Sequence, residues 1–167
     1  MSRWRPPAAK STPYITAQGF AALKDEQTAL WRRRRDVVKA LSAAAAEGDR
    51  SENAEYIYRK KELAGIDRRI RYLQKRLPEL KVVRESPASD RVFFGAWVKL
   101  ERADGNEVEY RIVGPDEIDS AEHYISLDSP VARALMKKQI DDEIEVKIGD
   151  TREKLHILDI RYVSTRE

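Results

Sequence analysis

Two acidic residues, Asp49 and Glu52, lie three positions apart in the segment Gly48-Asp49-Arg50-Ser51-Glu52-Asn53-Ala54, between two long stretches of helical periodicity. Mg²⁺ retains several waters and binds through one or two carboxylates together with substrate phosphates, so this pair has the chemistry of a magnesium ligand. At the tip of a helical hairpin, both carboxylates would stand in solvent and add little to stability. Such an exposed acidic tip has a use if it must reach a cation held by another molecule.

The same spacing also has a purely structural explanation. Asp-x-x-Glu before a helix is a capping box, in which Asp49 accepts from a backbone amide of the first turn and Glu52 reaches back to the cap residue. The two roles are compatible with each other, and the spacing alone leaves both open.

The elements that must position this pair are two helices. The first is expected to begin after Thr16, a typical capping residue, and to end at Gly48. Its apolar residues fall near a heptad frame at Phe20, Leu23, Leu30, Val37, Leu41 and Ala44. The second is expected to run from about Ser51 to Pro78, with apolar residues at steps of three and four: Leu63, Ile66, Ile70, Leu73 and Leu77. Because the turn between the helices is short, the pattern predicts an antiparallel coiled-coil hairpin over residues 14–83, with its acidic tip at 49–52.

Residues 1–13 are expected to form a flexible tail, and the pattern of residues 84–167 changes to period two. Strands are predicted over residues 92–100, 107–113, 124–127, 143–148 and 155–163. Ser129 followed by Pro130 predicts the start of a short helix over residues 131–138. The fold class is therefore α+β, with the hairpin followed by a small antiparallel sheet that carries one short helix.

Composition excludes several classes of protein. The chain has 167 residues, no cysteine and 37% charged residues, and no apolar run approaches the length of a membrane span. We expect a cytoplasmic monomer without disulfides or thiolate metal sites. His123 and His156 are isolated, and we find no nucleophile–base pair and no glycine-rich phosphate loop.

Charge divides the chain into a basic and an acidic half. Residues 1–83 hold 19 Lys and Arg against 10 Asp and Glu, whereas residues 84–167 hold 13 against 19. Many cations of the hairpin therefore lack a partner within it, and unpaired cations attract phosphates through counterion release. The alternative is a solvated coiled-coil flank with local ion pairs. The candidate cations are Arg59, Lys60, Arg68, Arg69, Arg71, Lys75 and Arg76 on the second helix and Arg32 to Arg35 on the first.

Several strings of the chain, in this order, resemble the Gre family of bacterial transcript cleavage factors, and most closely its GreB type. They are Gly48-Asp49-Arg50-Ser51-Glu52-Asn53-Ala54-Glu55-Tyr56, Ile66-Asp67-Arg68-Arg69-Ile70-Arg71-Tyr72-Leu73, Val92-Phe93-Phe94-Gly95-Ala96-Trp97-Val98, Arg111-Ile112-Val113-Gly114 and Tyr124-Ile125-Ser126-Leu127-Asp128-Ser129-Pro130-Val131-Ala132-Arg133-Ala134-Leu135. The resemblance covers residues 13–162 and implies an N-terminal coiled-coil hairpin followed by an FKBP-like, polymerase-docking domain over residues 84–167.

The resemblance also implies a function. Such proteins bind RNA polymerase, insert the hairpin into its secondary channel and stimulate the polymerase's own cleavage of backtracked RNA. Asp49 and Glu52 would share a Mg²⁺ with the polymerase active site, with no cofactor bound stably by the protein itself. Asn53 would support them by positioning RNA or water, and Arg50 would pair with an acidic group of the polymerase. The seven basic residues listed above on the second helix would contact the 3′ end of the nascent RNA, and Asp128, Ser129 and Pro130 would lie on the docking side.

The chain departs from the family pattern at two places. It has an extension before Pro13, and it reads Arg32-Arg33-Arg34-Arg35-Asp36-Val37 where many relatives have a proline and one more residue before the tip.

Two other functions remain open. One is a binding module that blocks the secondary channel and inhibits polymerase without cleavage. The other is an independent enzyme, either a nuclease or a prolyl isomerase whose pocket would be lined by Phe93, Phe94, Trp97, Tyr110 and Tyr124, although alternating strand positions favour a core role for most of these aromatic residues.

Overall fold

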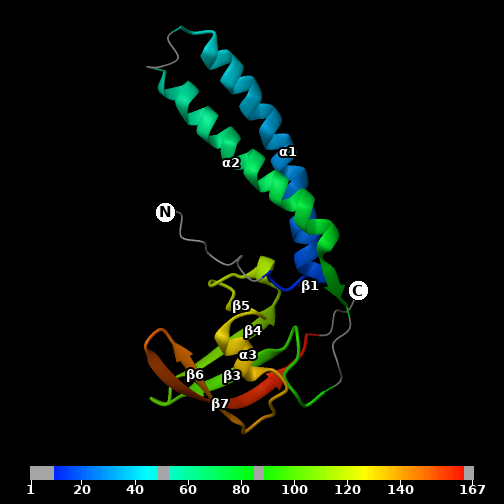
Figure 1. Ribbon diagram of the computed structural model, residues 1–167, viewed down its shortest axis with the longest axis vertical. Coiled ribbons are helices and arrows are strands. Elements are labelled where there is room, and N and C mark those ends of the chain that lie inside the picture. Colours follow the sequence, from blue (N-terminus) through cyan, green and yellow to red (C-terminus); the bar gives the residue numbers. More distant parts are fainter. Residues whose placement is uncertain (1–9, 49–52, 85–88, 164–167) are drawn as a thin grey trace, which may run out of the picture. The chain divides into compact units, whose positions relative to one another are not determined.

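The computed structural model describes residues 10–48, 53–84 and 89–163, and the chain forms two compact units (Figure 1). The hairpin unit is Gln18–Leu80, and the sheet unit joins the chain up to Ala17 with Lys81–Glu167. The elements in chain order are β1 (Tyr14–Thr16), α1 (Ala17–Ala45), α2 (Ala54–Arg76), the 3₁₀ turn η1 (Leu77–Glu79), β2 (Lys81–Val83), β3 (Trp97–Arg102), β4 (Glu107–Val113), the 3₁₀ turn η2 (Pro115–Glu117), β5 (Tyr124–Ser126), α3 (Pro130–Leu135), β6 (Glu143–Ile148) and β7 (Thr151–Arg161). None of the helices among the described residues is long and apolar enough to cross a membrane.

The hairpin unit consists of α1 and α2, which run antiparallel as the heptad pattern predicts (Figure 1). Val37, Ile66 and Ile70 form its buried centre, with Leu30 and Leu63 packed against them. Gly48 follows α1 with a φ of 130°, a conformation that costs a residue without Cβ little. The second helix begins at Ala54, later than the predicted start near Ser51, because Asn53 has extended backbone and caps it.

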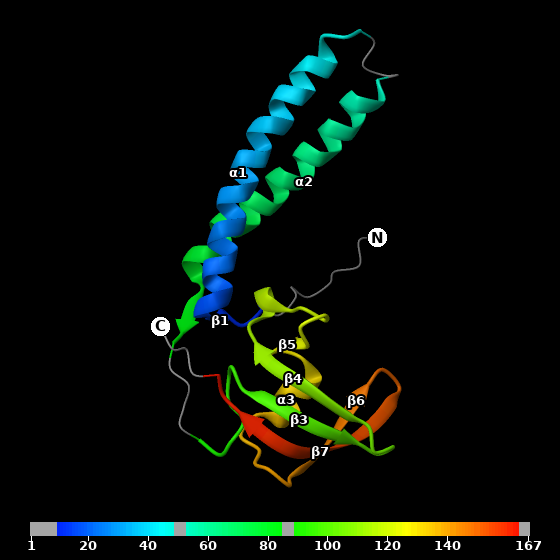
Figure 2. The same cartoon turned by 180° about the vertical axis from the view of Figure 1, so that it is seen from behind.

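The sheet unit contains a five-stranded sheet in the order β5-β4-β3-β7-β6, whose strands are visible from behind in Figure 2. Three of its four pairings are antiparallel, as predicted. The edge strand β5 differs, because it pairs with β4 in parallel. The connection over residues 114–123 contains η2 and carries the chain back only to the level of Arg111, so β5 pairs in parallel with the last three residues of β4, whereas a two-residue turn would have enforced antiparallel pairing.

Strand boundaries follow the sequence pattern closely in β4 and β6, which match their predicted ranges. The predicted strand over residues 92–100 is wrong at its start, because β3 begins only at Trp97. Gly95 has a φ of 86°, which interrupts the extended backbone before that point. The helix α3 ends at Leu135 rather than 138, and Lys137 beyond it has a φ of 68°.

The core of the sheet unit lies between one face of the sheet and α3. Its buried members include Val98, Leu100, Ile112, Leu135 and Ile157, all fully buried. None of the five aromatic residues considered for a pocket is fully buried, so the core role predicted for most of them is wrong. Tyr110 packs against this core. Trp97 alternates with the buried Val98 and instead contacts Tyr124 edge-on, with ring centroids 5.8 Å apart.

A short parallel pair, β1 with β2, lies in the sheet unit, whereas the sequence-based division placed both segments in the hairpin. Glu117 of η2 holds β1 in place: its carboxylate accepts from the backbone amide of Thr16 at 3.0 Å and from the Thr16 hydroxyl. The same carboxylate accepts from the Gly114 amide at 2.9 Å. The two chain segments that connect the units are therefore anchored to each other and to η2.

Candidate functional site

Asn53 joins the two helices at the end of the hairpin that carries the predicted acidic tip. Its side-chain Oδ1 accepts from the Tyr56 amide at 3.1 Å and caps α2. Its Nδ2 donates to the backbone carbonyl of Ala44, in the last turn of α1, at 2.8 Å. One amide group thus pairs a first-turn donor of α2 and adds a second hydrogen bond to the Ala44 carbonyl of α1, which also accepts from the Glu47 amide at 3.2 Å.

The predicted carboxylate pair, Asp49 and Glu52, lies outside the described residues, as does Arg50. The structure does show that the cap of α2 is Asn53, four residues beyond the position that the capping-box interpretation assigned to Asp49. That interpretation is therefore wrong for α2, and the metal interpretation stays a prediction. The role predicted for Asn53 toward RNA or water also stays a prediction, and in this structure both polar ends of its amide bind within the hairpin.

The predicted RNA-contacting cations fall into two groups, of which the first is held in ion pairs. Arg59 donates to Glu55 at 2.8 Å and to Glu62 at 3.0 Å. These hydrogen bonds raise the pKa of the Arg59 guanidinium. Arg69 donates to Glu26 through two nitrogens, at 2.6 and 3.0 Å. Arg76 is buried and lies 3.8 Å from Glu79.

The second group is exposed and has no ion pair within the described residues. It includes Arg68, Arg71 and Lys75. Lys61, which was not among the predicted contacts, is also exposed and lies on the same face of α2. Steps of seven, three and four residues place all four on one face of α2. We call this row of Lys61, Arg68, Arg71 and Lys75 the cationic stripe. Lys60 lies beside it, with its amine 6.0 Å from the centre of the Tyr56 ring.

The ion pairs lie at the helix–helix seam, which explains why the stripe is left unpaired. On one flank of the seam, Arg33 contacts Glu62 at 2.6 Å, and the Glu26–Arg69 pair follows one heptad away. On the other flank, Arg34 donates to Asp67 at 2.7 Å. The hydrogen bond from Arg33 lowers the pKa of Glu62, and that from Arg59 adds to the effect. Glu26, Glu62 and Asp67 thus pair across the seam, while the outer face of α2 keeps the positive charge of the cationic stripe.

The three predicted docking residues have local structural roles in the sheet unit. The Asp128 carboxylate accepts from the backbone amide of Thr12 at 2.9 Å and from the Thr12 hydroxyl. Ser129 caps α3, because its hydroxyl accepts from the Ala132 amide at 3.2 Å, and Pro130 is the first helical residue, as predicted. Docking itself stays a prediction.

Among the described residues, no group of three or more His, Asp or Glu side chains is arranged to hold a metal ion. His156 lies 3.3 Å from Asp141 in an exposed pair, and the ring of His123 lies beside Tyr110. Neither histidine belongs to a larger cluster within this part of the chain.

Comparison with known proteins gives a consistent result along the chain. Residues 13–82 match the family described as "Transcription elongation factor, N-terminal", and residues 86–162 match "Transcription elongation factor, GreA/GreB, C-term". A protein of Xanthomonas axonopodis named transcription elongation factor GreB is 57% identical over 98% of this chain and 99% of its own length. One of Pseudomonas aeruginosa with the same name is 54% identical over 97% of this chain and 98% of its own length.

Among solved structures, GreA factor homolog 1 of Thermus thermophilus is 21% identical to this chain. The match has a TM-score of 0.41 and covers 89% of this chain and 97% of that one. The family assignment rests on the sequence matches, which extend from Pro13 to Tyr162 and cover both units. The identity to the two relatives, over half of all positions, is far above what unrelated chains share. This chain therefore belongs to the GreA/GreB family of transcription elongation factors.

Proposed function

We propose that this protein is a transcript cleavage factor. It binds RNA polymerase, inserts the α1–α2 hairpin into the secondary channel and stimulates the polymerase's own Mg²⁺-dependent cleavage of backtracked RNA, which rescues arrested complexes. The observation that carries the proposal is the tip of the hairpin: the chain between α1 and α2 holds Asp49 and Glu52, and Asn53 fastens it to both helices.

The donor set of the tip suits the metal. Carboxylate oxygens are hard ligands, and two of them leave positions on Mg²⁺ for water and for phosphate oxygens. Phosphodiester hydrolysis at a two-metal site uses a pair of magnesium ions, which together stabilise the attacking and leaving oxygens when both are bound. Asp49 and Glu52 would hold that ion in the polymerase site, and either carboxylate could orient the attacking water. The protein lends ligands and is not itself the catalyst.

The stripe supports a second part of the proposal, contact with the 3′ RNA that backtracking extrudes. Arg68, Arg71 and Lys75 are exposed and lack ion pairs within the described residues, so they can neutralise phosphates without breaking the hairpin. Arg59, Arg69 and Arg76 would have to leave a carboxylate first. We assign the RNA contact to the unpaired cations and a seam role to the paired ones.

The acidic sheet unit, with Asp128, Ser129 and Pro130 at the start of α3, is the proposed docking side for polymerase. Its excess of acidic over basic residues suits a basic surface of the partner.

The decisive experiment incubates the purified protein with RNA and Mg²⁺, with and without stalled, backtracked polymerase. We expect cleavage only with polymerase, and loss of stimulation in Asp49→Asn and Glu52→Gln, which remove charge and keep side-chain shape. Cleavage without polymerase would identify a nuclease instead. Inhibited elongation without cleavage would identify a channel-blocking inhibitor. Full stimulation by both variants would refute the metal role.

The stripe is tested by the triple variant Arg68→Gln, Arg71→Gln, Lys75→Gln. We expect a larger loss of cleavage on RNA that is backtracked by many nucleotides than on RNA that is backtracked by few, because only the longer RNA would extend along the cationic stripe. A matched control with the same charge change, Lys138→Gln, Lys147→Gln, Lys154→Gln, lies in the sheet unit and should leave that ratio unchanged. Equal losses on both RNAs would argue against RNA contact.

A further inference from the structure

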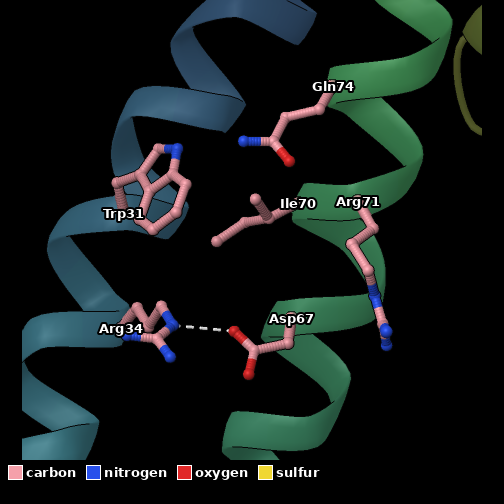
Figure 3. Close-up of a pocket in the computed structure, with 6 residues that line it drawn as sticks. All are labelled: Trp31, Arg34, Asp67, Ile70, Arg71 and Gln74. Atoms are coloured by element: carbon pink, nitrogen blue, oxygen red, sulfur yellow. Dashed lines mark hydrogen bonds and ion pairs between the residues drawn. The ribbon is translucent and has the colours of Figure 1, made fainter.

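A groove lies on one flank of the hairpin seam, away from the acidic tip. It has a volume of about 430 Å³ and is lined by Trp31 and Arg34 of α1 and by Asp67, Ile70, Arg71 and Gln74 of α2 (Figure 3). The volume is within the range of roughly 300–1,000 Å³ that small-ligand sites occupy. Figure 3 shows Ile70 and Gln74 extending from α2 toward α1, while Arg71 projects along α2.

The groove exists because a charged residue occupies a seam position. One seam row of α1 is apolar and recurs every seven residues: Leu23, Leu30, Val37 and Ala44. The other row, three residues before each of these, reads Phe20, Gln27, Arg34 and Leu41. Figure 3 shows Arg34 extending from α1 toward Asp67 of α2, to which it donates at 2.7 Å, so an ion pair stands at this seam position in place of an apolar contact.

Trp31 is the unusual member of this lining, because 41% of this large aromatic residue is exposed. An open indole face is a stacking platform, and base–aromatic stacking is the common feature of sites for single-stranded nucleic acid. Gln74 adds an exposed amide, which both donates and accepts hydrogen bonds as a base edge requires. Arg71 belongs to both the groove and the cationic stripe, so a base in the groove would have its phosphate near Arg71, at the edge of the stripe.

We propose that this groove is a nucleobase site for single-stranded RNA, in which one base stacks on Trp31, Gln74 contacts its edge, and Arg71 contacts an adjacent phosphate. The site would add base stacking to the proposed contact between the cationic stripe and the 3′ RNA, so it rests on the proposed function. An acidic peptide would satisfy the cations equally well, but it would leave the indole face and the amide without a matching group. The combination of aromatic plane, amide and unpaired cations favours RNA.

The test uses Trp31 as its own probe. The full-length double variant Trp4→Phe, Trp97→Phe leaves Trp31 as the sole tryptophan, since the chain has three. It is titrated at low salt with a single-stranded oligoribonucleotide and with an abasic ribose-phosphate of the same length. We expect quenching of Trp31 by the normal oligonucleotide, with an affinity at least about fivefold above that of the abasic one, the lower end of one stacked base.

Two further variants locate the contact. Trp31→Leu keeps apolar packing but removes the fluorophore, so the affinities of both variants are measured from the fluorescence anisotropy of the end-labelled oligonucleotides. Trp31→Leu should bind normal RNA with the affinity of the abasic oligonucleotide, and Gln74→Leu should lose affinity in part, with circular dichroism at 222 nm confirming the fold of each. Equal affinities for the two oligonucleotides, or equal quenching by an acidic peptide of the same charge, would overturn the proposal. Asp49→Asn should abolish cleavage stimulation and leave this quenching intact, so the two proposals can fail separately.

Discussion

Asn53 offers a direct way to test how the tip is built, because its one amide makes two bonds to different helices. Its Oδ1 caps α2 through the Tyr56 amide, and such a cap contributes about 1 kcal/mol. Its Nδ2 bond to the Ala44 carbonyl contributes about 0.5–1.5 kcal/mol. Asn53→Ala loses both and should lower the free energy of unfolding of the hairpin by about 2 kcal/mol.

Two conservative substitutions separate the two bonds. Asn53→Ser keeps a good cap and loses the donor to Ala44, so we expect a loss of about 1 kcal/mol. Asn53→Asp also keeps the cap, but it places a carboxylate against a carbonyl at the negative end of α1, so its loss should equal or exceed that of the serine variant. Of the three variants, Asn53→Ala should have the lowest free energy of unfolding, or one equal to that of Asn53→Asp.

The assay is urea unfolding followed at 222 nm, where the helices dominate, together with hydrogen exchange in the last turn of α1. Lys39→Gln, at an exposed position of α1 and with nearly unchanged helix propensity, is the control and should change stability by less than about 0.5 kcal/mol. A loss below about 0.5 kcal/mol in Asn53→Ala, or an Asn53→Asp variant as stable as the wild type, would refute the two-bond account. Because these bonds fasten both ends of the segment with Asp49 and Glu52, we also expect Asn53→Asp to lower cleavage stimulation.

Three further predictions concern stability and pH. A Cβ at Gly114 would lie 1.9 Å from the Tyr14 carbonyl oxygen, so Gly114→Ala should displace β1 and cost about 1–3 kcal/mol in thermal unfolding; an unchanged midpoint would contradict this contact. Gly65→Ala, in the interior of α2, meets only an Arg68 guanidinium nitrogen at 3.9 Å and should stabilise the hairpin by about 0.5–1 kcal/mol, measured by urea unfolding. The hydrogen bond from Arg33 holds the pKa of Glu62 below its ordinary 4.5, so the stability it contributes is present above pH 4.5 and lost as the pH falls through the lowered value. Glu62→Gln should therefore flatten the pH dependence of hairpin unfolding in that acid range, and an unchanged slope would exclude this contribution.

The outline of both units follows from local sequence pattern. The alternating steps of three and four from Leu63 to Leu77 specify a coiled-coil seam, and Gly48 marks the turn that follows the first helix, which ends three residues before the predicted position, at Ala45. Ser129 and Pro130 specify the start of α3, because a cap hydroxyl and a proline without a backbone donor suit only that position. Each of these signals depends on residues that are close together in the sequence, so the helices and their boundaries can be predicted without knowledge of the tertiary structure.

The site depended more on tertiary contacts. The sequence marks Arg68 and Arg69 as equivalent neighbours, yet Arg69 reaches Glu26 across the seam while Arg68 does not. Parallel pairing of β5 and the anchoring of β1 by Glu117 likewise join residues far apart in the chain.

Sequence by itself determined the family, the two helices of the hairpin, the α+β character of the second unit and the candidate acidic pair, because residue type and short-range periodicity encode them. Tertiary structure alone decided which cations are neutralised, that Asn53 bridges two helices, and that Arg34 leaves a groove beside Trp31. The physical reason is that a charge or an amide has several possible partners along the chain, and only the packed seam brings one of them within bonding distance.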